Sequence, residues 1–265
     1  MKKKLLSVLC LVFILALAGC TSGQPAVEDT DSDVEYIKNK GTLVVGITDF
    51  APMDYLDDNG EWIGFDADLA RVVAKSLGVK VEFVEIDWDN KLFEIQDKNI
   101  DVIWNGMTLT DEVLSALTCS EPYLVNAPVL VVSKANAGKY ANLEDIKDIN
   151  IAVEAGSSGE GVAKDNGLNY RSVLTQADTL LEVSAGTSDA SIIDLLMAGA
   201  MIGENTSFPD LVYTVAFDEE YYGVGCRKDS DLAAYIDGIF EDLEKDGSLR
   251  QLAEKYGVEE ALVNK

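Results

Sequence analysis

Four segments of polar and glycine residues each follow an apolar run that has the character of a buried strand. They are residues 48–50, 105–108, 154–158 and Asp194. Carboxylates, hydroxyls and amides gathered at one place can hold a small polar molecule by hydrogen bonds and charge. The chain contains no histidine, which excludes a Ser-His-Asp or Cys-His nucleophile and any histidine-liganded zinc or iron site. The sequence therefore favours binding over catalysis, with no metal and no cofactor.

The glycine-rich segment at residues 156–161 (GSSGEG) precedes a predicted helix. Free N–H groups at the start of a helix favour a carboxylate or another anion. The segment lacks the lysine of a nucleotide-binding P-loop, which argues against a nucleotide site. Asp194 also stands before a predicted helix, where an aspartate is often only an N-cap.

Strand and helix signals alternate around these segments. Strands are predicted at residues 42–47, 80–85 and 100–104, and helices at 65–77 and 91–96. In the first helix Phe65, Leu69, Val72, Val73 and Leu77 share one face, and Gly78 ends it. This order predicts an α/β lobe with a largely parallel sheet. Ligands of such sheets bind beyond the carboxyl ends of the strands, where the polar segments fall.

A second, similar passage follows, with strands predicted at 150–153 and 190–193. One helix is predicted at 161–165, a second begins at residue 178, and a third follows the strand at 190–193 and runs through Met197. Two apolar runs, 128–133 and 221–226, are each able to carry the chain between lobes as a two-strand hinge. Helices at 231–243 and 249–256 would return to the first lobe. The prediction is a two-lobed α/β fold, with two α/β lobes joined by a two-strand hinge and a cleft that closes by hinge motion.

The predicted boundaries follow from these elements. Residues 35–131 form the first part of lobe 1 and residues 132–220 form lobe 2. Residues 221–265 supply the return strand and the C-terminal helices of lobe 1.

The N-terminus combines three lysines, an apolar stretch at 5–18 and Leu17-Ala18-Gly19-Cys20. This pattern is typical of an export signal, here residues 1–19, and is too short for a stable membrane span. Its end resembles the lipobox of bacterial lipoproteins, which implies that Cys20 is diacylated and becomes the mature N-terminus. Two acyl chains are enough for stable membrane anchoring, and residues 20–34 read as a flexible tether. The alternative is a plain secretory signal with an incidental cysteine.

Composition narrows the possible partners. The net charge is −26, and removal of the signal lysines makes it more negative, so the chain would repel nucleic acid. Apolar residues make up 48% of the chain, enough for a sizeable core. Cys119 and Cys226 either pair or remain buried free thiols, and their spacing matches no metal or redox motif.

A series of short motifs carries a family resemblance. In order they are GFDADL (64–69), VEFV (81–84), DWD (87–89), NGMTLT (105–110), SEPY (120–123), AGSS (155–158), DA (189–190) with Asp194, YGV (222–224) with Arg227 and Lys228, DG (246–247) and KYG (255–257). Together they resemble the family 3 extracellular solute-binding proteins of ABC importers, the polar-amino-acid group, over residues 36–258. The resemblance implies the two-lobed periplasmic-binding-protein-like fold.

The resemblance implies roles for the first-lobe residues. Phe50 and Trp88 correspond to aromatic walls that sandwich the ligand side chain, since aromatic rings offer rigid area and attract cations. Asn105, Gly106 and Thr108 correspond to the loop that holds the ligand's α-groups. The alternatives are that Trp88 is ordinary core and that the loop is a plain turn.

It also implies roles for the second lobe and for the whole protein. Ser157 and Ser158 correspond to the loop that receives the ligand carboxylate, and Asp194 to the acceptor of its α-ammonium group. The implied protein is a non-catalytic, monomeric lipoprotein outside the bacterial cell membrane. It would bind an amino acid or a related small amine and deliver it to an ABC permease.

One position departs from the family pattern. Val113 stands where the family usually has an arginine that clamps the ligand carboxylate, and no Lys or Arg near it in sequence replaces that group. Glu154 stands where the family tends to have a neutral residue facing the pocket. We therefore expect a ligand with net positive or amine-rich character. The alternative is a subgroup that binds ordinary amino acids differently.

Two other classes remain open from the sequence. A dehydratase-type enzyme on the same fold would need a proton donor in the cleft, for which Glu154 is the candidate. A ligand sensor or adhesin would bind without feeding an importer.

Overall fold

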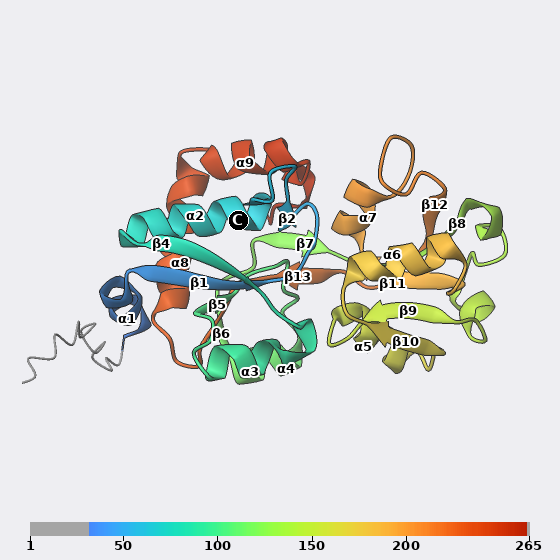
Figure 1. The fold of residues 1–265 in the computed structure, drawn as a ribbon, viewed down its shortest axis with the longest axis horizontal. Helices are drawn as coiled ribbons and strands as arrows, with labels where there is room; N and C mark the ends of the chain where they lie inside the picture. Colours follow the sequence, from blue (N-terminus) through green and yellow to red (C-terminus); the bar gives the residue numbers. More distant parts are fainter. Residues whose placement is uncertain (1–31, 264–265) are drawn as a thin grey trace, which may run out of the picture.

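Two α/β halves lie side by side in the computed structural model, which describes residues 32–263 (Figure 1). Each half contains a five-stranded mixed sheet, ordered β4-β1-β5-β14-β6 in the first and β10-β9-β11-β8-β12 in the second. This arrangement confirms the predicted two-lobed α/β class. The signal segment and Cys20 lie outside the described residues.

The first sheet is parallel at one side and antiparallel at the other. Its strands are β1 (Thr42–Ile47), β4 (Lys80–Glu85), β5 (Val102–Ile103), β6 (Thr118–Cys119) and β14 (Gly225–Cys226). Strand β1 runs parallel to β4 and β5, whereas β14 is antiparallel to β5 and β6. The polar segments after β1 and β5 therefore leave the same edge of the sheet.

Helices cover both faces of this sheet. One face carries α1 (Asp33–Lys40), α2 (Phe65–Leu77), α8 (Leu232–Lys245) and α9 (Ser248–Tyr256), and the other carries α3 (Lys91–Gln96) and α4 (Asp111–Ala116). Helix α2 has the predicted bounds, and Gly78 ends it in the left-handed conformation at φ 76°. Its predicted apolar face is buried apart from Val72, which is half-buried.

The second sheet has the same plan. Its strands are β8 (Pro128–Ser133), β9 (Ile151–Glu154), β10 (Tyr170–Val173), β11 (Ala190–Asp194) and β12 (Leu211–Ala216). Strand β9 is parallel to β10 and β11, and β8 is antiparallel to β11 and β12. The helices are α5 (Ser158–Asp165), α6 (Gln176–Ala185) and α7 (Leu195–Met201). Helices α5 and α6 begin earlier than the sequence predicts.

The halves are joined by a two-stranded antiparallel sheet of β7 (Leu124–Asn126) and β13 (Glu220–Tyr222). The predicted hinge run at 128–133 is instead β8, a strand inside the second sheet, so the predicted boundary between 131 and 132 falls within a strand. The physical reason is that β8 lies between β11 and β12 with five of its six residues buried. A strand that is buried on both faces of a sheet is as apolar as a segment that connects two lobes, so the composition of the run does not distinguish them.

Short elements complete the fold. They are β2 (Tyr55–Leu56), β3 (Trp62–Ile63) and the 3₁₀ turns η1 (Trp88–Asn90), η2 (Lys134–Asn136), η3 (Leu143–Ile146) and η4 (Glu259–Ala261). Among the described residues, no helix is long and apolar enough to cross a membrane. Helix α1 begins at Asp33, slightly before the expected end of the tether.

Candidate functional site

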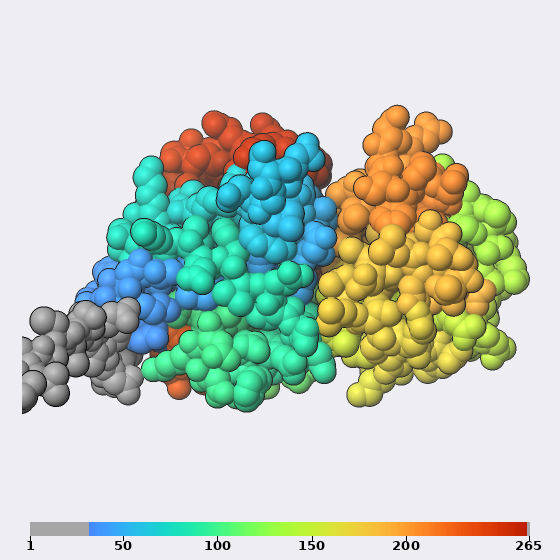
Figure 2. All heavy atoms as spheres, viewed as in Figure 1, coloured from blue at the N-terminus to red at the C-terminus, as the bar shows by residue number. Residues whose placement is uncertain are grey.

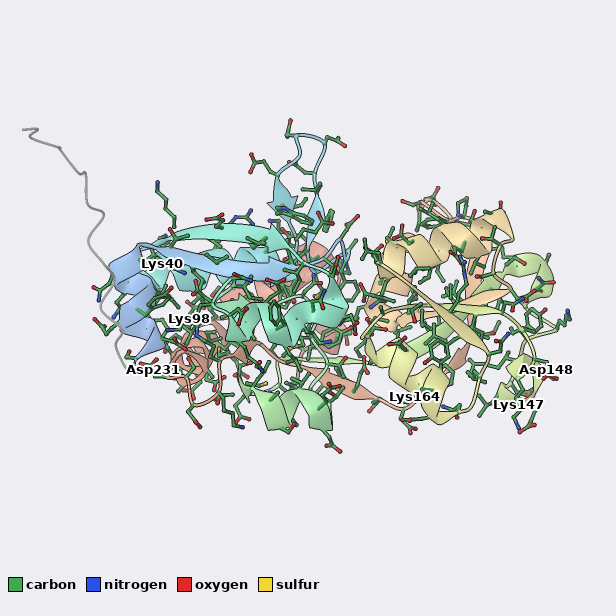
Figure 3. All side chains as sticks on the ribbon, turned by 60° about the horizontal axis from the view of Figure 1, so that its bottom comes forward. Lys40, Lys98, Lys147, Asp148, Lys164 and Asp231 are labelled. Atoms are coloured by element: carbon green, nitrogen blue, oxygen red, sulfur yellow. The ribbon has the colours of Figure 1, made fainter. Side chains whose placement is uncertain are left out.

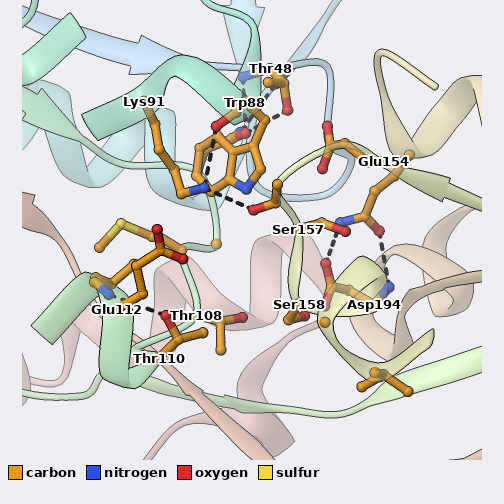
Figure 4. Close-up of a pocket in the computed structure, with 18 of the residues that line it drawn as sticks. Thr48, Trp88, Lys91, Thr108, Thr110, Glu112, Glu154, Ser157, Ser158 and Asp194 are labelled. Atoms are coloured by element: carbon orange, nitrogen blue, oxygen red, sulfur yellow. Dashed lines mark hydrogen bonds between the residues drawn. The ribbon is translucent and has the colours of Figure 1, made fainter. Parts of the chain in front are cut away.

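A pocket of about 370 Å³ lies between the two halves, at the carboxyl ends of strands from both sheets. Figure 2 shows the furrow that separates the halves on one face. The structure brings all nine residues predicted for ligand binding into the pocket lining: Phe50, Trp88, Asn105, Gly106, Thr108, Glu154, Ser157, Ser158 and Asp194. Their labelled members surround one space in Figure 4.

The aromatic wall at Phe50 depends on Gly106. The Phe50 ring meets Tyr222 edge-on, with centroids 6.4 Å apart at 73°. Gly106 has a φ of 55°, and a Cβ there would come within 2.4 Å of Phe50 Cε1. Only glycine accepts both the conformation and the close approach. The Gly106 N–H donates to Asp66 Oδ2 at 2.7 Å, which fixes the turn.

Asn105 uses its amide within the first half. Its Oδ1 accepts from the Thr48 N–H at 2.9 Å and from the Thr48 hydroxyl at 2.6 Å. Its Nδ2 donates to Thr48 O at 3.1 Å and to Asp54 Oδ2 at 2.8 Å. Three of these bonds tie the loop after β5 to the residue that follows β1, and the fourth ties it to Asp54. The side chain of Asn105 therefore positions the pocket wall, while Thr108 on the same loop is half-buried at the lining.

The two serines lie at the start of α5. Ser157 is the N-cap, and its hydroxyl accepts from the Glu160 N–H at 3.2 Å. The Ser158 hydroxyl donates to Glu220 Oε1 at 3.2 Å. The N-terminus of α5 thus borders the pocket, and its peptide N–H groups favour negative charge there.

Asp194 is a buried carboxylate held by two amides. It accepts hydrogen bonds from Asn126 Nδ2 and Gln176 Nε2, and its own N–H donates to Gln176 Oε1 at 2.9 Å. Burial raises the pKa of Asp194 well above its usual range, and the nearby charge of Glu220 adds to the effect. A buried carboxylate without a cation is a favourable site for a ligand ammonium group, which would supply the missing charge.

Glu154 is the second buried acid of the pocket. It ends β9, is 3% exposed, and its Oε1 has no hydrogen-bond partner among the described residues. Burial raises the pKa of Glu154 to about 8, although the charge of Lys91 and hydrogen bonding by Gln176 act in the opposite direction. The unpartnered oxygen can accept a hydrogen bond from a bound molecule.

Sequence reasoning missed Lys91, the first residue of α3. Its ammonium group lies 5.0 Å from the centroid of the Trp88 ring and donates to Trp88 O at 3.2 Å and to Gly156 O at 2.8 Å (Figure 4). The available signal was its position three residues after Trp88 on a helical segment, which places both side chains on one face. Gln176 was also missed, and its sequence context gives no such signal.

The two halves touch at Gly156. Its φ is 71°, and a Cβ at this position would lie 2.7 Å from Asp89 Cα in the other half. Together with the bond from Lys91 to Gly156 O, this contact closes one side of the pocket.

Val113 lies where the resemblance leads to an arginine. It is 3% exposed, lines the pocket and packs in an apolar cluster with Trp88 and Met107. Among the described residues, no group of three or more acidic or cysteine side chains is arranged to hold a metal ion.

Two α/β halves with a polar, aromatic-walled pocket between them define a two-lobed binding protein. Residues 43–259 match the model of the bacterial extracellular solute-binding proteins, family 3, and the chain belongs to this family. Like its relatives, it is a binding protein and not an enzyme.

Named relatives agree with this assignment. The chain is 30% identical over 224 residues to the L-cystine-binding protein TcyJ of Escherichia coli K12, covering 83% of this chain and 84% of that protein. A crystal structure of the P235GK mutant of ArgBP from T. maritima aligns with TM-score 0.79 and 35% identity, covering 84% and 98%. An ABC uptake transporter substrate-binding protein from Streptococcus pneumoniae with bound histidine aligns with TM-score 0.79 and 27% identity, covering 88% and 99%.

Proposed function

We propose that this protein is the amino-acid-binding component of an ABC uptake transporter and binds its ligand in the pocket between the halves. The observation that carries the proposal is that one pocket contains a place that favours a positive group and another that favours a negative group. Asp194 favours the ligand ammonium group, and the start of α5 favours the carboxylate. The names of two relatives, which give cystine and histidine as ligands, support an α-amino acid.

The ligand is an amino acid with a cationic or amine-rich side chain. Two features support this: Glu154 and Asp194 are both buried acids at the lining, and Val113 is apolar. An acidic ligand would bring further negative charge into a pocket that already contains these carboxyl groups. Trp88 and Phe50 offer aromatic faces and edges to the side chain.

The ligand class is tested with the mature protein by thermal unfolding against the standard amino acids, followed by calorimetry of those that stabilise it. L-arginine, L-lysine and L-histidine should raise the melting temperature, whereas L-glutamate and L-aspartate should not. Mass spectrometry of small molecules that co-purify with the protein gives an independent readout. Stabilisation by acidic or neutral amino acids, without stabilisation by cationic ones, would contradict the cationic ligand.

The protein is anchored to the membrane through Cys20. The export pattern of residues 1–19 and the small residues before Cys20 support this, and residues 20–34 would then tether the fold. Intact-mass analysis of the native protein should give a mature chain that begins at a diacylated Cys20. The C20S variant should appear in the medium or periplasm instead of the membrane fraction. Membrane retention of the C20S variant would contradict the anchor.

Delivery to a permease is tested in cells. Deletion of the gene should lower uptake of the ligand identified by calorimetry, and expression of the wild-type chain should restore it. Unchanged uptake at ligand concentrations near the dissociation constant would favour the sensor alternative.

A further inference from the structure

Lys91 of α3 brings a positive charge to the pocket, which lacks the arginine expected at position 113. Val113 belongs to α4 and Lys91 to α3, and both line the same pocket. Among the described residues of the lining, Lys91 is the one with a positive charge. The pocket has therefore kept a cation, although a different element supplies it.

The ammonium group of Lys91 points to the loop before α5. It donates to Gly156 O at 2.8 Å, and Gly156 directly precedes Ser157 and Ser158 (Figure 4). Its second bond goes to Trp88 O at 3.2 Å. Both acceptors are neutral carbonyls, and an ammonium group has three donors, so a third N–H remains for a ligand. This donor stands beside the helix N-terminus that favours negative charge.

The charges around Lys91 indicate which part of a ligand its ammonium group would bind. Burial lowers the pKa of Lys91, while the carboxylates of Glu112, Glu154, Asp89 and Glu160 act to raise it. A ligand cation already has Asp194 and Glu154 available as acceptors. A ligand carboxylate buried in the same pocket needs a cation as well as N–H groups, and it needs the cation still more when Asp194 or Glu154 is ionised by a ligand ammonium group.

We propose that Lys91 anchors the ligand carboxylate, in the role that an arginine at position 113 would otherwise have, and thereby makes the pocket specific for amino acids over amines. This rests on the proposed function, because it takes the ligand to be an amino acid. Lys91 belongs to the first half and the start of α5 to the second. A carboxylate bound between them links ligand recognition to closure of the cleft.

The test compares amino acids with their decarboxylated counterparts by calorimetry: L-arginine with agmatine, and L-histidine with histamine. Wild-type protein should prefer the amino acid of each pair. The K91M variant keeps the length and the apolar part of the side chain, and should bind the amino acid about tenfold to a hundredfold more weakly. Its affinity for agmatine and histamine should stay within about threefold, because these molecules have no carboxylate to lose. The K91R variant should retain most of the affinity for the amino acid.

A matched control removes a lysine outside the pocket. Lys164 is exposed on α5 and does not line the cavity, and Figure 3 shows its place in the second half. K164M should leave all four affinities unchanged. Thermal unfolding of each variant shows that it is folded, and K91Q provides a polar replacement if K91M is not.

The alternatives give different results. Equal weakening of L-arginine and agmatine by K91M would overturn the proposal and leave Lys91 as a residue that only holds the cleft closed. Tighter binding of agmatine and L-arginine by K91M would overturn it too, because Lys91 would then compete with the ligand side chain for Trp88. If the wild-type protein binds no amino acid, the proposed function fails first, and the role of Lys91 fails with it.

Discussion

At the scale of single residues, the pocket combines buried acids with amide donors. Asn126 and Gln176 satisfy the oxygens of Asp194 without neutralising a charge. Glu154 keeps one oxygen without a partner. Amide donors lower the cost of burying a carboxylate, but only a cation compensates its charge fully. A positively charged ligand, as proposed above, would supply this charge and favour the ionised form of both acids.

Replacement of Asp194 by Asn tests this preference. D194N should lower the affinity for L-arginine about thirtyfold or more, because the ligand ammonium loses its charged partner. The new amide nitrogen would face one of the two existing donors, so the free energy of unfolding should fall by about 1–2 kcal/mol. Calorimetry and urea unfolding measure the two effects. The exposed D148N, at a site labelled in Figure 3, is the control, and binding by D194N equal to wild type would refute the role.

The raised pKa of Glu154 leads us to expect a pH-dependent free energy of unfolding in the ligand-free protein. Its ordinary pKa is 4.5 and burial raises it to about 8. Between these values the folded chain holds a proton that the unfolded chain releases. The contribution of Glu154 to the free energy of unfolding therefore falls as pH rises, by up to about 1.4 kcal/mol per pH unit. E154Q lacks this contribution, so the stability of E154Q relative to wild type should rise between pH 5 and pH 8. Urea unfolding at three pH values measures it, and a difference that does not change with pH would contradict the prediction.

The sequence located the pocket residues better than their roles. Asp194 and Glu154 end strands, so topology alone brings them to one edge of their sheet. Lys91 was missed as a replacement for the arginine because it belongs to α3 and Val113 to α4, and the two residues line one pocket only in the folded chain. The four internal bonds of Asn105 were equally invisible, since they depend on how the loop after β5 folds against β1.

At the scale of elements, the pairing of β6 with β14 decides the state of the two cysteines. Cys119 lies opposite Gly225, and Cys226 is the next residue along its strand. Side chains alternate between the faces of a strand, so the two sulfur atoms lie on opposite faces of the sheet. Cys119 accordingly packs with the cluster around Val113, and Cys226 belongs to the main core. The structure has both as free thiols.

Alkylation checks this arrangement on a chain that begins after Cys20. Under denaturing, non-reducing conditions both Cys119 and Cys226 should be labelled. In the folded protein labelling should be slow, because burial raises the pKa of Cys119 to about 11 and leaves little thiolate at neutral pH. Cys226 is buried and should react more slowly still. A mass lower by two hydrogens, with no labelling in denaturant, would reveal a disulfide instead.

The bounds of a helix or strand were predictable where a residue in its own sequence ends it. Helix α2 has its predicted bounds because Gly78 adopts the left-handed conformation that stops a helix. The prediction of a hinge at residues 128–133 is wrong because an apolar run does not reveal whether its neighbours are strands or solvent. Only the pairing with β11 and β12 distinguishes the two.

At the scale of the whole molecule, two short strands and the contacts across the pocket connect the halves. Strands β7 and β13 join them, and Gly156 meets Asp89 across the pocket. A ligand that bridges the halves can shift the balance between open and closed forms of the cleft. The cross-cleft contacts are therefore the place where closure can be changed without changing either core.

Replacement of Gly156 by Ala should open the cleft. The added Cβ would lie 2.7 Å from Asp89 Cα, a backbone atom of the other half, and would push the two halves apart. We expect a larger radius of gyration by small-angle scattering and an affinity for L-arginine about tenfold lower, because binding must also close the cleft. G186A is the matched control, since Gly186 has φ 73° and no atom within 4 Å of the added Cβ. Both variants carry the same backbone strain of about 1–2 kcal/mol, so a scattering curve that changes equally in both would mean that strain, and not the contact with Asp89, is responsible.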